Sequence, residues 1–155
     1  MKLDSKARRA LRSAARFYAV QALFQMEASD SPIGTVLREF EDHRIGIEVE
    51  GEAWAEADIN FFRRVVEAAV DRQAAIDQVT DRALVAKWPI ARIDPTLRAL
   101  FRAAGAELLT TERDARIILS EYVGLAGDFF RDSREPKFVN AVLDHMAHEL
   151  RPDEF

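Results

Sequence analysis

The stretch "IDPTLRALFRAAGAELL" (residues 93–109) shows most plainly what kind of fold this chain adopts. Asp94 followed by Pro95 is typical of a helix start, because an Asp side chain accepts a hydrogen bond from a free backbone N–H and proline fits the first turn. Apolar side chains then recur every three or four residues, at Leu97, Leu100, Phe101, Ala104 and Leu108. This spacing places them on one side of a helix. The stretch therefore predicts a helix whose apolar side is buried.

Helical spacing of apolar residues continues on both sides of this stretch, whereas alternating, strand-like spacing is almost absent. Ser31 with Pro32, Asp114, and Pro136 are further helix-start signals. The expected helices cover about residues 4–28, 31–42, 58–79, 94–109, 114–130 and 136–150. A turn or restart near residues 80–84, with Pro89 ending an element, leaves room for a seventh helix. The segment over residues 43–57 is expected to be a loop.

The composition fits one helical domain. The chain has 155 residues, of which 48% are hydrophobic and 32% charged, with only six glycines and five prolines. This length is enough to bury a sizeable core in a single domain, which we expect to span residues 1–155. We therefore predict an all-α fold, a compact helical bundle of about six to seven helices with short connections.

Several classes of protein are excluded by what the sequence lacks. It has no cysteine, which excludes disulfides, iron–sulfur clusters and thiol catalysis. It has no apolar run long enough to cross a membrane, and arginines interrupt the N-terminal segment where a secretion signal needs an apolar core. His145 and His148 do not have the spacing of a zinc protease, and no catalytic motif is present. We expect a cytoplasmic protein that is not an enzyme and has no metal or cofactor.

Positive charge is concentrated at the start of the chain. Residues 1–27 hold six Lys or Arg and two acidic residues, although the formal net charge of the whole chain is −5. No acid lies between residues 6 and 25 to pair with these cations. Four arginines fall on one flank of the predicted helix: Arg8, Arg9, Arg12 and Arg16.

This cationic stripe is either a solvated helix face or the binding surface for an anionic partner. Like charges left unpaired cost stability, which favours a partner. Arginine forks onto phosphate and stacks on bases, whereas lysine-rich segments are more typical of lipid surfaces. We therefore favour a nucleic acid over a membrane, with an acidic protein as the remaining alternative.

Four stretches resemble the NusB family of bacterial transcription antitermination factors. They are "RSAARFYAVQALFQME" (12–27), "RIDPTLRALFRAAGAELL" (92–109), "ILSEYVGLAGDFF" (118–130) and "PKFVNAVLDHMAHELR" (136–151). The resemblance implies two three-helix bundles plus an extra helix. It also implies that the protein binds the boxA segment of nascent RNA together with the small-subunit ribosomal protein NusE. The complex keeps RNA polymerase from terminating, notably on ribosomal RNA operons.

The resemblance also implies which residues bind RNA. Arg12 and Arg16 match basic positions of the family's N-terminal helix, and Arg102 matches another. The same cationic surface is extended by Lys6, Arg8 and Arg9. A second RNA-facing patch is implied by Lys137 for phosphate, Phe138 for base stacking and Asn140 for a base edge.

The implied protein-partner positions are Arg98, Arg116 and Glu121, although Leu97 stands where the family pattern leads us to expect an acid. Other readings remain open for three of the site residues. Phe138 fits a core position, Asn140 a capping or solvated position, and Glu121 a partner for an arginine.

Two other functions remain open at this point. Helical modules of the NusB type also occur fused to RNA cytosine methyltransferase domains, so the chain could be an accessory to such an enzyme. It could also be an adaptor whose basic helix binds an acidic protein. A homodimer that hides the basic surface in the absence of RNA is a further expectation to be tested.

Overall fold

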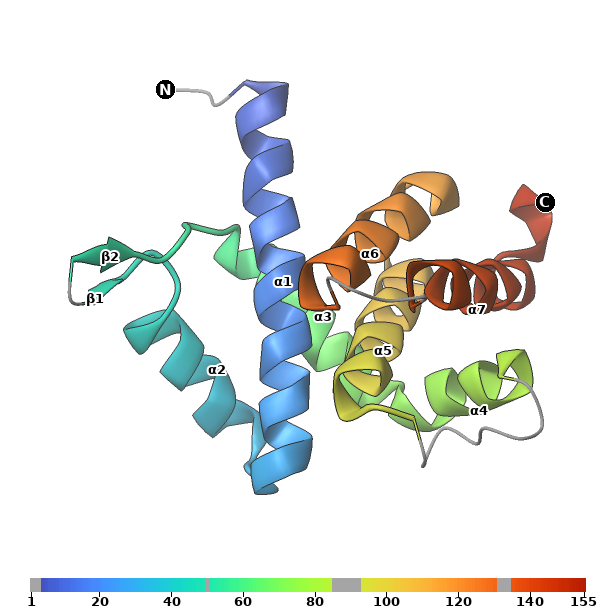
Figure 1. Ribbon diagram of the computed structural model, residues 1–155, viewed down its shortest axis with the longest axis horizontal. Helices are drawn as coiled ribbons and strands as arrows, with labels where there is room; N and C mark the ends of the chain where they lie inside the picture. Colours follow the sequence, from blue (N-terminus) through green and yellow to red (C-terminus); the bar gives the residue numbers. More distant parts are fainter. Residues whose placement is uncertain (1–3, 50, 85–92, 131–134) are drawn as a thin grey trace.

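The computed structural model describes residues 4–49, 51–84, 93–130 and 135–155 (Figure 1). Within these ranges it contains seven α-helices, which confirms the predicted all-α class. They are α1 (Ser5–Ser29), α2 (Ile33–His43), α3 (Ile59–Asp71), α4 (Gln73–Ala83), α5 (Pro95–Thr110), α6 (Ala115–Phe129) and α7 (Glu135–Leu150). A short antiparallel hairpin, β1 (Glu48–Val49) and β2 (Glu52–Ala53), lies between α2 and α3, and a 3-10 helix (Pro152–Glu154) follows α7.

The predicted starts of α5 and α6 are confirmed in atomic detail. The carboxylate of Asp94 accepts a hydrogen bond from the N–H of Thr96 at 2.7 Å, and Asp114 accepts one from the N–H of Arg116 at 2.8 Å. The side chain of Asp4 caps α1 in the same way, by accepting a hydrogen bond from the N–H of Ala7 at 2.7 Å. These bonds satisfy backbone donors that have no partner within the helix. The predicted end of an element at Pro89 lies outside the described residues.

The predicted start of α2 is wrong by one position. Pro32, rather than Ser31, holds the N-cap position, and no side chain caps this helix. The hydroxyl of Ser31 lies 2.7 Å from that of Ser29, so its hydrogen bond is made across the preceding turn instead.

The predicted helix over residues 58–79 is in fact two helices, α3 and α4, which meet at Arg72. The break lets α4 turn and pack on α5. A Cβ atom at Gly105 of α5 would lie only 2.5 Å from Cγ2 of Ile76, so α4 approaches α5 more closely than a larger residue at position 105 would allow. The buried apolar residues keep helical spacing from α3 into α4, for example at Val66, Ala69, Ile76 and Val79, so the sequence does not mark the break. It is seen only in the folded structure.

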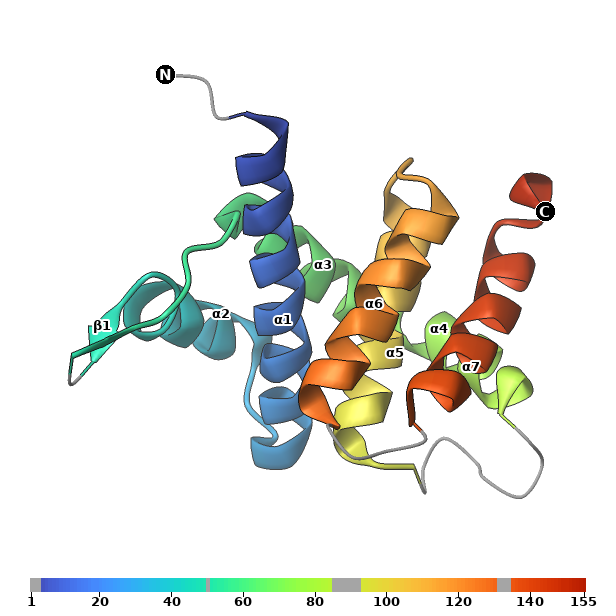
Figure 2. The same ribbon diagram turned by 45° about the horizontal axis from the view of Figure 1, so that its top comes forward.

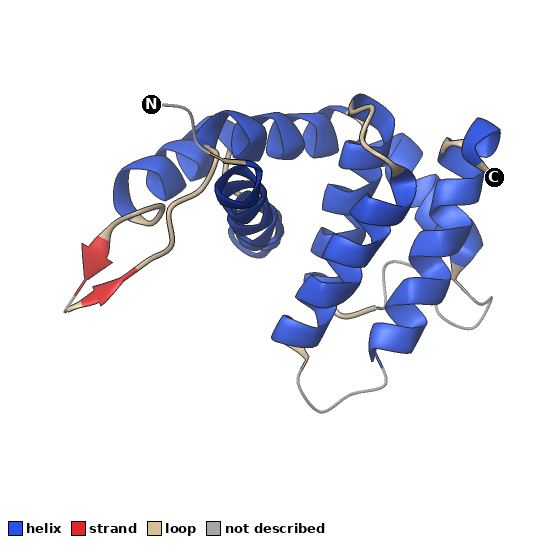
Figure 3. Ribbon diagram, turned by 90° about the horizontal axis from the view of Figure 1, so that it is seen from above, coloured by secondary structure: helices blue, strands red, loops and turns tan. Residues whose placement is uncertain are grey.

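The region over residues 43–57, predicted as a loop, contains the hairpin. Gly46 and Gly51 have φ angles of +71° and +83°, which glycine adopts without strain. The N–H of Trp54 donates to the carbonyl of Ile47 at 2.9 Å, which extends the pairing beyond the two short strands. Figure 3 shows the hairpin reaching outward on the side of the molecule away from the C-terminus.

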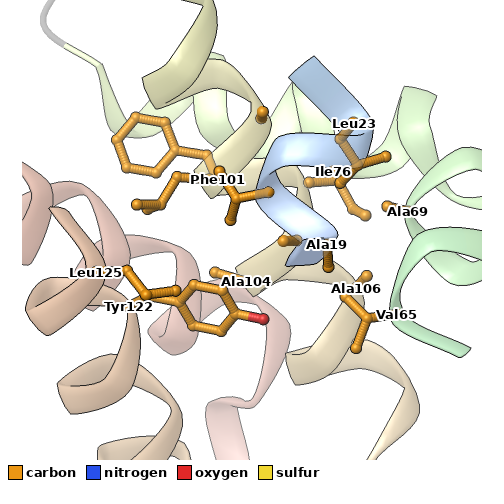
Figure 4. Close-up of a cluster of buried hydrophobic side chains, with 14 of the residues drawn as sticks. Ala19, Leu23, Val65, Ala69, Ile76, Phe101, Ala104, Ala106, Tyr122 and Leu125 are labelled. Carbon is orange, nitrogen blue, oxygen red and sulfur yellow. The ribbon is translucent and has the colours of Figure 1, made fainter. Parts of the chain in front are cut away.

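The helices form two groups that meet along α1 and α5 (Figures 1 and 2). The first group is α1, α2 and α3, and the second is α5, α6 and α7, with α4 packed on α5 and α7. This arrangement agrees with two three-helix bundles plus an extra helix. Figure 4 shows side chains from both groups meeting in one core, among them Ala19, Leu23, Ile76, Phe101, Ala104, Tyr122 and Leu125. Alanines at the contact let α1 and α5 approach closely.

Candidate nucleic-acid interface

Helices α1 and α6 are neighbours, with the C-terminal end of α6 next to α1 and its start farther away (Figures 1 and 2). Ser13 donates a hydrogen bond to Oε2 of Glu121 at 2.9 Å. Further along both helices, the rings of Phe17 and Phe129 stack with their centroids 5.2 Å apart. A groove lies between the two helices, and residues of both line it.

The N-terminal end of this groove is lined by an arginine cluster, which we define as Arg9, Arg12, Arg113 and Arg116. Arg9 and Arg116 are exposed, and the other two are half-buried. Within the described parts of the chain, Arg9, Arg12 and Arg116 form no salt bridge, whereas Arg113 contacts Glu107 at 3.1 Å. The cluster therefore presents more positive charge than its surroundings neutralise.

The crowding of positive charge affects Arg12. Its pKa is lowered, chiefly by partial burial, and the charges of Arg113 and Arg16 add to this effect while Asp58 opposes it. Arginine keeps its positive charge in proteins, so the cluster stays cationic. A bound anion such as phosphate would relieve the repulsion.

Two further predicted residues continue this surface. Lys6 and Arg8 are both exposed on the first turns of α1, and neither forms a salt bridge within the described residues. Both belong to the same part of α1 as Arg9, and the charge of Arg8 contributes to lowering the pKa of Arg12.

The expected exposure of Arg16 is wrong, because this side chain is buried. Only 1% of the residue is exposed, and its Nε and Nη2 donate to the two carboxylate oxygens of Glu107 at 2.8 Å each. The hydroxyl of Tyr122 donates to the same carboxylate at 3.0 Å. Burial acts to lower the pKa of Arg16, but its hydrogen bonds and ion pair with Glu107 raise it overall. Arg16 thus neutralises a core carboxylate.

Arg102 and Arg98, from the first turns of α5, are also paired. Arg102 contacts Asp77 through two hydrogen bonds of 2.9 Å each, and it contacts Glu27 at 3.1 Å. Nε of Arg98 donates to Glu27 at 2.8 Å. These ion pairs join α5 to the end of α1 and to α4, so their first role in this structure is to hold helices together.

The second predicted patch lies at the start of α7. Lys137 and Asn140 are exposed, and Phe138 is half-buried, with its ring edge-on to Phe101 at a centroid distance of 6.4 Å. α7 begins where α6 ends, so this patch is at the opposite end of α6 from the arginine cluster (Figure 2). The structure does not bring the two patches together, and RNA contact by either one stays a prediction.

The three predicted protein-partner residues do not form one surface. Arg98 lies at the start of α5, Arg116 belongs to the arginine cluster, and Glu121 lies in the α1–α6 groove next to Ser13. Nη1 of Arg16 is 3.6 Å from Oε2 of Glu121. Glu121 therefore lies where the alternative interpretation, a carboxylate paired with an arginine, would place it.

Sequence reasoning missed two residues of the groove. Arg113 was not assigned a role, although it directly precedes the helix cap Asp114 and is thereby held beside the start of α6. Trp54 was hidden in a segment predicted as a loop, yet it lines the groove and is 38% exposed. The sequence signal for Trp54 was that it is a large aromatic residue within an acidic, glycine-containing segment.

Comparisons with known proteins add to these observations. A model described as the NusB family matches residues 13–148. The chain is 45% identical to "Transcription antitermination protein NusB" of Maricaulis maris, over 97% of this chain and 94% of that protein. It is 47% identical to a protein of the same name from Rhodopseudomonas palustris, over 98% and 89%.

Solved structures have the same fold. A structure of NusB from T. maritima is 27% identical, with a TM-score of 0.74 over 99% of this chain and 97% of that one. A structure of the antitermination factors NusB and NusE in complex with double-stranded RNA has a TM-score of 0.72, covering 90% of this chain and 98% of that one. Its identity is 23%, so this second likeness is one of fold. None of the described helices is long and apolar enough to cross a membrane.

Proposed function

The chain belongs to the NusB family, and we propose that it is a transcription antitermination factor that binds the boxA segment of nascent RNA together with NusE. In this role it prevents RNA polymerase from terminating, above all on ribosomal RNA transcripts. The protein acts in the cytoplasm as a single, non-catalytic domain. Its task is to hold an RNA segment and a protein partner at the same time.

The observation that carries the RNA-binding part of this proposal is the arginine cluster. Elsewhere in the molecule, arginines such as Arg63, Arg82 and Arg102 each contact an acidic side chain. The N-terminal end of the α1–α6 groove instead gathers Arg9, Arg12 and Arg116, which form no salt bridge within the described residues, although the whole chain has a net charge of −5. Arginine binds phosphate through paired N–H donors, so a single-stranded RNA backbone fits this surface.

Fluorescence anisotropy tests the proposal directly. A labelled boxA RNA and a scrambled RNA of equal composition are titrated with the protein at two salt concentrations, with and without NusE. We expect tighter binding to boxA, an increase when NusE is present, and a steep loss of affinity at high salt. Equal binding of both RNAs without an effect of NusE would overturn the antitermination role. It would favour the alternative of an adaptor for an acidic protein.

A pair of double variants identifies the surface. Arg9→Ala with Arg12→Ala removes two positive charges from the groove. Arg38→Ala with Arg72→Ala removes two exposed charges from α2 and from the α3–α4 junction. We expect the first pair to reduce the slope of log K against log salt by about 1.4, because each phosphate contact on a single strand contributes about 0.7. The second pair, with the same change in net charge, should leave the slope unchanged.

A further inference from the structure

The other end of the α1–α6 groove has a different chemistry from the arginine cluster. It is a cavity of about 650 Å³, lined by the aromatic side chains of Phe17, Tyr18 and Trp54. The rings of Tyr18 and Trp54 stack at a centroid distance of 6.3 Å and an angle of 23°. Tyr18 is 2% exposed whereas Trp54 is 38% exposed, so the indole is the accessible ring of this stacked pair.

The wall is held in place by the fold. The hydroxyl of Tyr18 donates to the carbonyl of Ala55 at 2.6 Å, which ties the hairpin segment to α1. The rings of Phe17 and Phe129 stack nearly parallel, at an angle of 2°, and join α1 to α6. An aromatic surface that is already ordered loses little conformational entropy when a planar ligand stacks on it.

Carboxylates line the same cavity. Glu121 and Asp128 of α6 both line it. The hydrogen bond from Ser13 and the contact with Arg16 both use Oε2 of Glu121. Among the described residues, Oε1 of Glu121 has no hydrogen bond, so it is available as an acceptor for a ligand.

The two ends of the groove are continuous. Ser120 and Glu121 line both the cavity with the aromatic wall and the end with the arginine cluster. A ligand that occupies the whole groove must therefore be anionic at one end. At the other end it must be planar and able to donate a hydrogen bond. A strand of nucleic acid has both properties, because phosphates alternate with bases. A basic peptide would be repelled by the arginine cluster.

We propose that the aromatic end of the α1–α6 groove is a nucleobase pocket that prefers a base with an exocyclic amino group. This inference rests on the proposed RNA-binding function. The base stacks on Trp54, and its amino group donates to Oε1 of Glu121. The adjoining phosphates bind Arg9, Arg12 and Arg116. The carboxylates repel phosphate, so the base enters the cavity while the backbone stays at the cationic end.

Tryptophan fluorescence gives a direct readout. The chain has two tryptophans, so the variant Trp88→Phe leaves Trp54 as the single emitter. This protein is titrated with oligocytidylate and with oligouridylate of equal length. The two bases have similar ring sizes and differ in an amino against a carbonyl group. We expect saturable quenching of Trp54 by both, with tighter binding of oligocytidylate.

Three variants separate stacking from amino recognition. Trp54→Ala should weaken binding of oligocytidylate roughly tenfold without changing the salt slope, and Trp54→Phe should restore most of the loss. Phe24→Ala is the matched control, since Phe24 is an aromatic residue that is 39% exposed and does not line the groove. Glu121→Gln should reduce the preference for oligocytidylate over oligouridylate. Melting temperatures of all variants are measured alongside.

The outcomes distinguish this inference from the proposed function. Salt-dependent RNA binding that requires Arg9 and Arg12 but does not quench Trp54 would overturn the pocket and leave the RNA-binding function standing. Absence of any RNA binding would overturn both. Quenching by an arginine-rich peptide but not by RNA would show that the cavity accepts a basic protein side chain. Equal affinity for the two oligonucleotides, unaffected by Glu121→Gln, would overturn the role of the carboxylate.

Discussion

Two arginine-rich regions of this molecule have opposite surroundings. At the N-terminal end of the α1–α6 groove, Arg9, Arg12 and Arg116 form no salt bridge within the described residues. At the junction of α1, α4 and α5, Arg98 and Arg102 contact Glu27 and Asp77. Both regions are rich in arginine. Among the described residues, neighbouring helices place acidic side chains in contact with the arginines of the second region but not with these three arginines of the first.

This difference teaches that the number of arginines on a helix does not reveal their role. An arginine that faces an acid on another helix joins two elements, and one that faces other arginines is left to bind an external anion. Arg12 and Arg16 show the contrast one turn apart on α1. Both border the groove, but Arg12 is half-buried without a salt bridge among the described residues, whereas Arg16 is buried against Glu107.

The largest expected effect on stability comes from Arg16. Replacing it by Ala leaves the carboxylate of Glu107 buried with only Arg113 as a cationic partner. We expect the free energy of unfolding to fall by about 3–5 kcal/mol, the usual cost of breaking a buried ion pair. Denaturant unfolding followed by circular dichroism measures this loss. An effect as small as that of Arg12→Ala would contradict the structural role of Arg16.

A smaller loss is expected at the second region. Arg102→Ala removes two hydrogen bonds to Asp77 and one to Glu27 from a side chain that is 13% exposed. Partly buried, charge-assisted hydrogen bonds of this kind lead us to expect a loss of about 1–2 kcal/mol in unfolding free energy. A double-mutant cycle with Asp77→Ala isolates the pair. Additive effects in the cycle would show that the two side chains do not interact in solution.

Acid should weaken the same region. A hydrogen bond from Arg98 and the positive charges of Arg98 and Arg102 lower the pKa of Glu27 from its usual 4.5, although partial burial opposes this shift. The stabilisation is therefore fully present above the unfolded pKa and is lost as the pH falls through the lowered folded pKa. Unfolding of the wild type and of Glu27→Gln is compared from about pH 6 to about pH 3. The stability difference between them should shrink, and a constant difference would refute the pairing.

The smallest effect on stability is expected in the groove. Arg9→Ala with Arg12→Ala removes no salt bridge within the described residues, so the unfolding free energy should change by no more than about 0.5 kcal/mol. The same double variant should lower RNA affinity at low salt, as measured by anisotropy. A stability loss similar to that of Arg102→Ala would show that both regions are structural, and the contrast between them would disappear.

Local features of the fold could be predicted from the sequence because they depend on neighbours in the chain. Asp94 and Asp114 cap helices through backbone groups two residues away. The break at Arg72 could not be predicted in this way, since no local signal marks it and it is accompanied by the packing of Ile76 on Gly105, which lies on another helix. The hairpin that carries Trp54 was missed because its two strands have only two residues each.

The sequence by itself determined the all-helical class, most helix starts and the concentration of cations on the first half of α1. These properties are set by spacing and by short-range hydrogen bonds. Only the tertiary structure decided which of the cations are left to bind a partner. Arg16 meets a carboxylate 91 positions away in the chain, and Trp54 joins the groove through α1 and the hairpin segment. Burial and charge pairing depend on such distant contacts, which spacing along one helix does not contain.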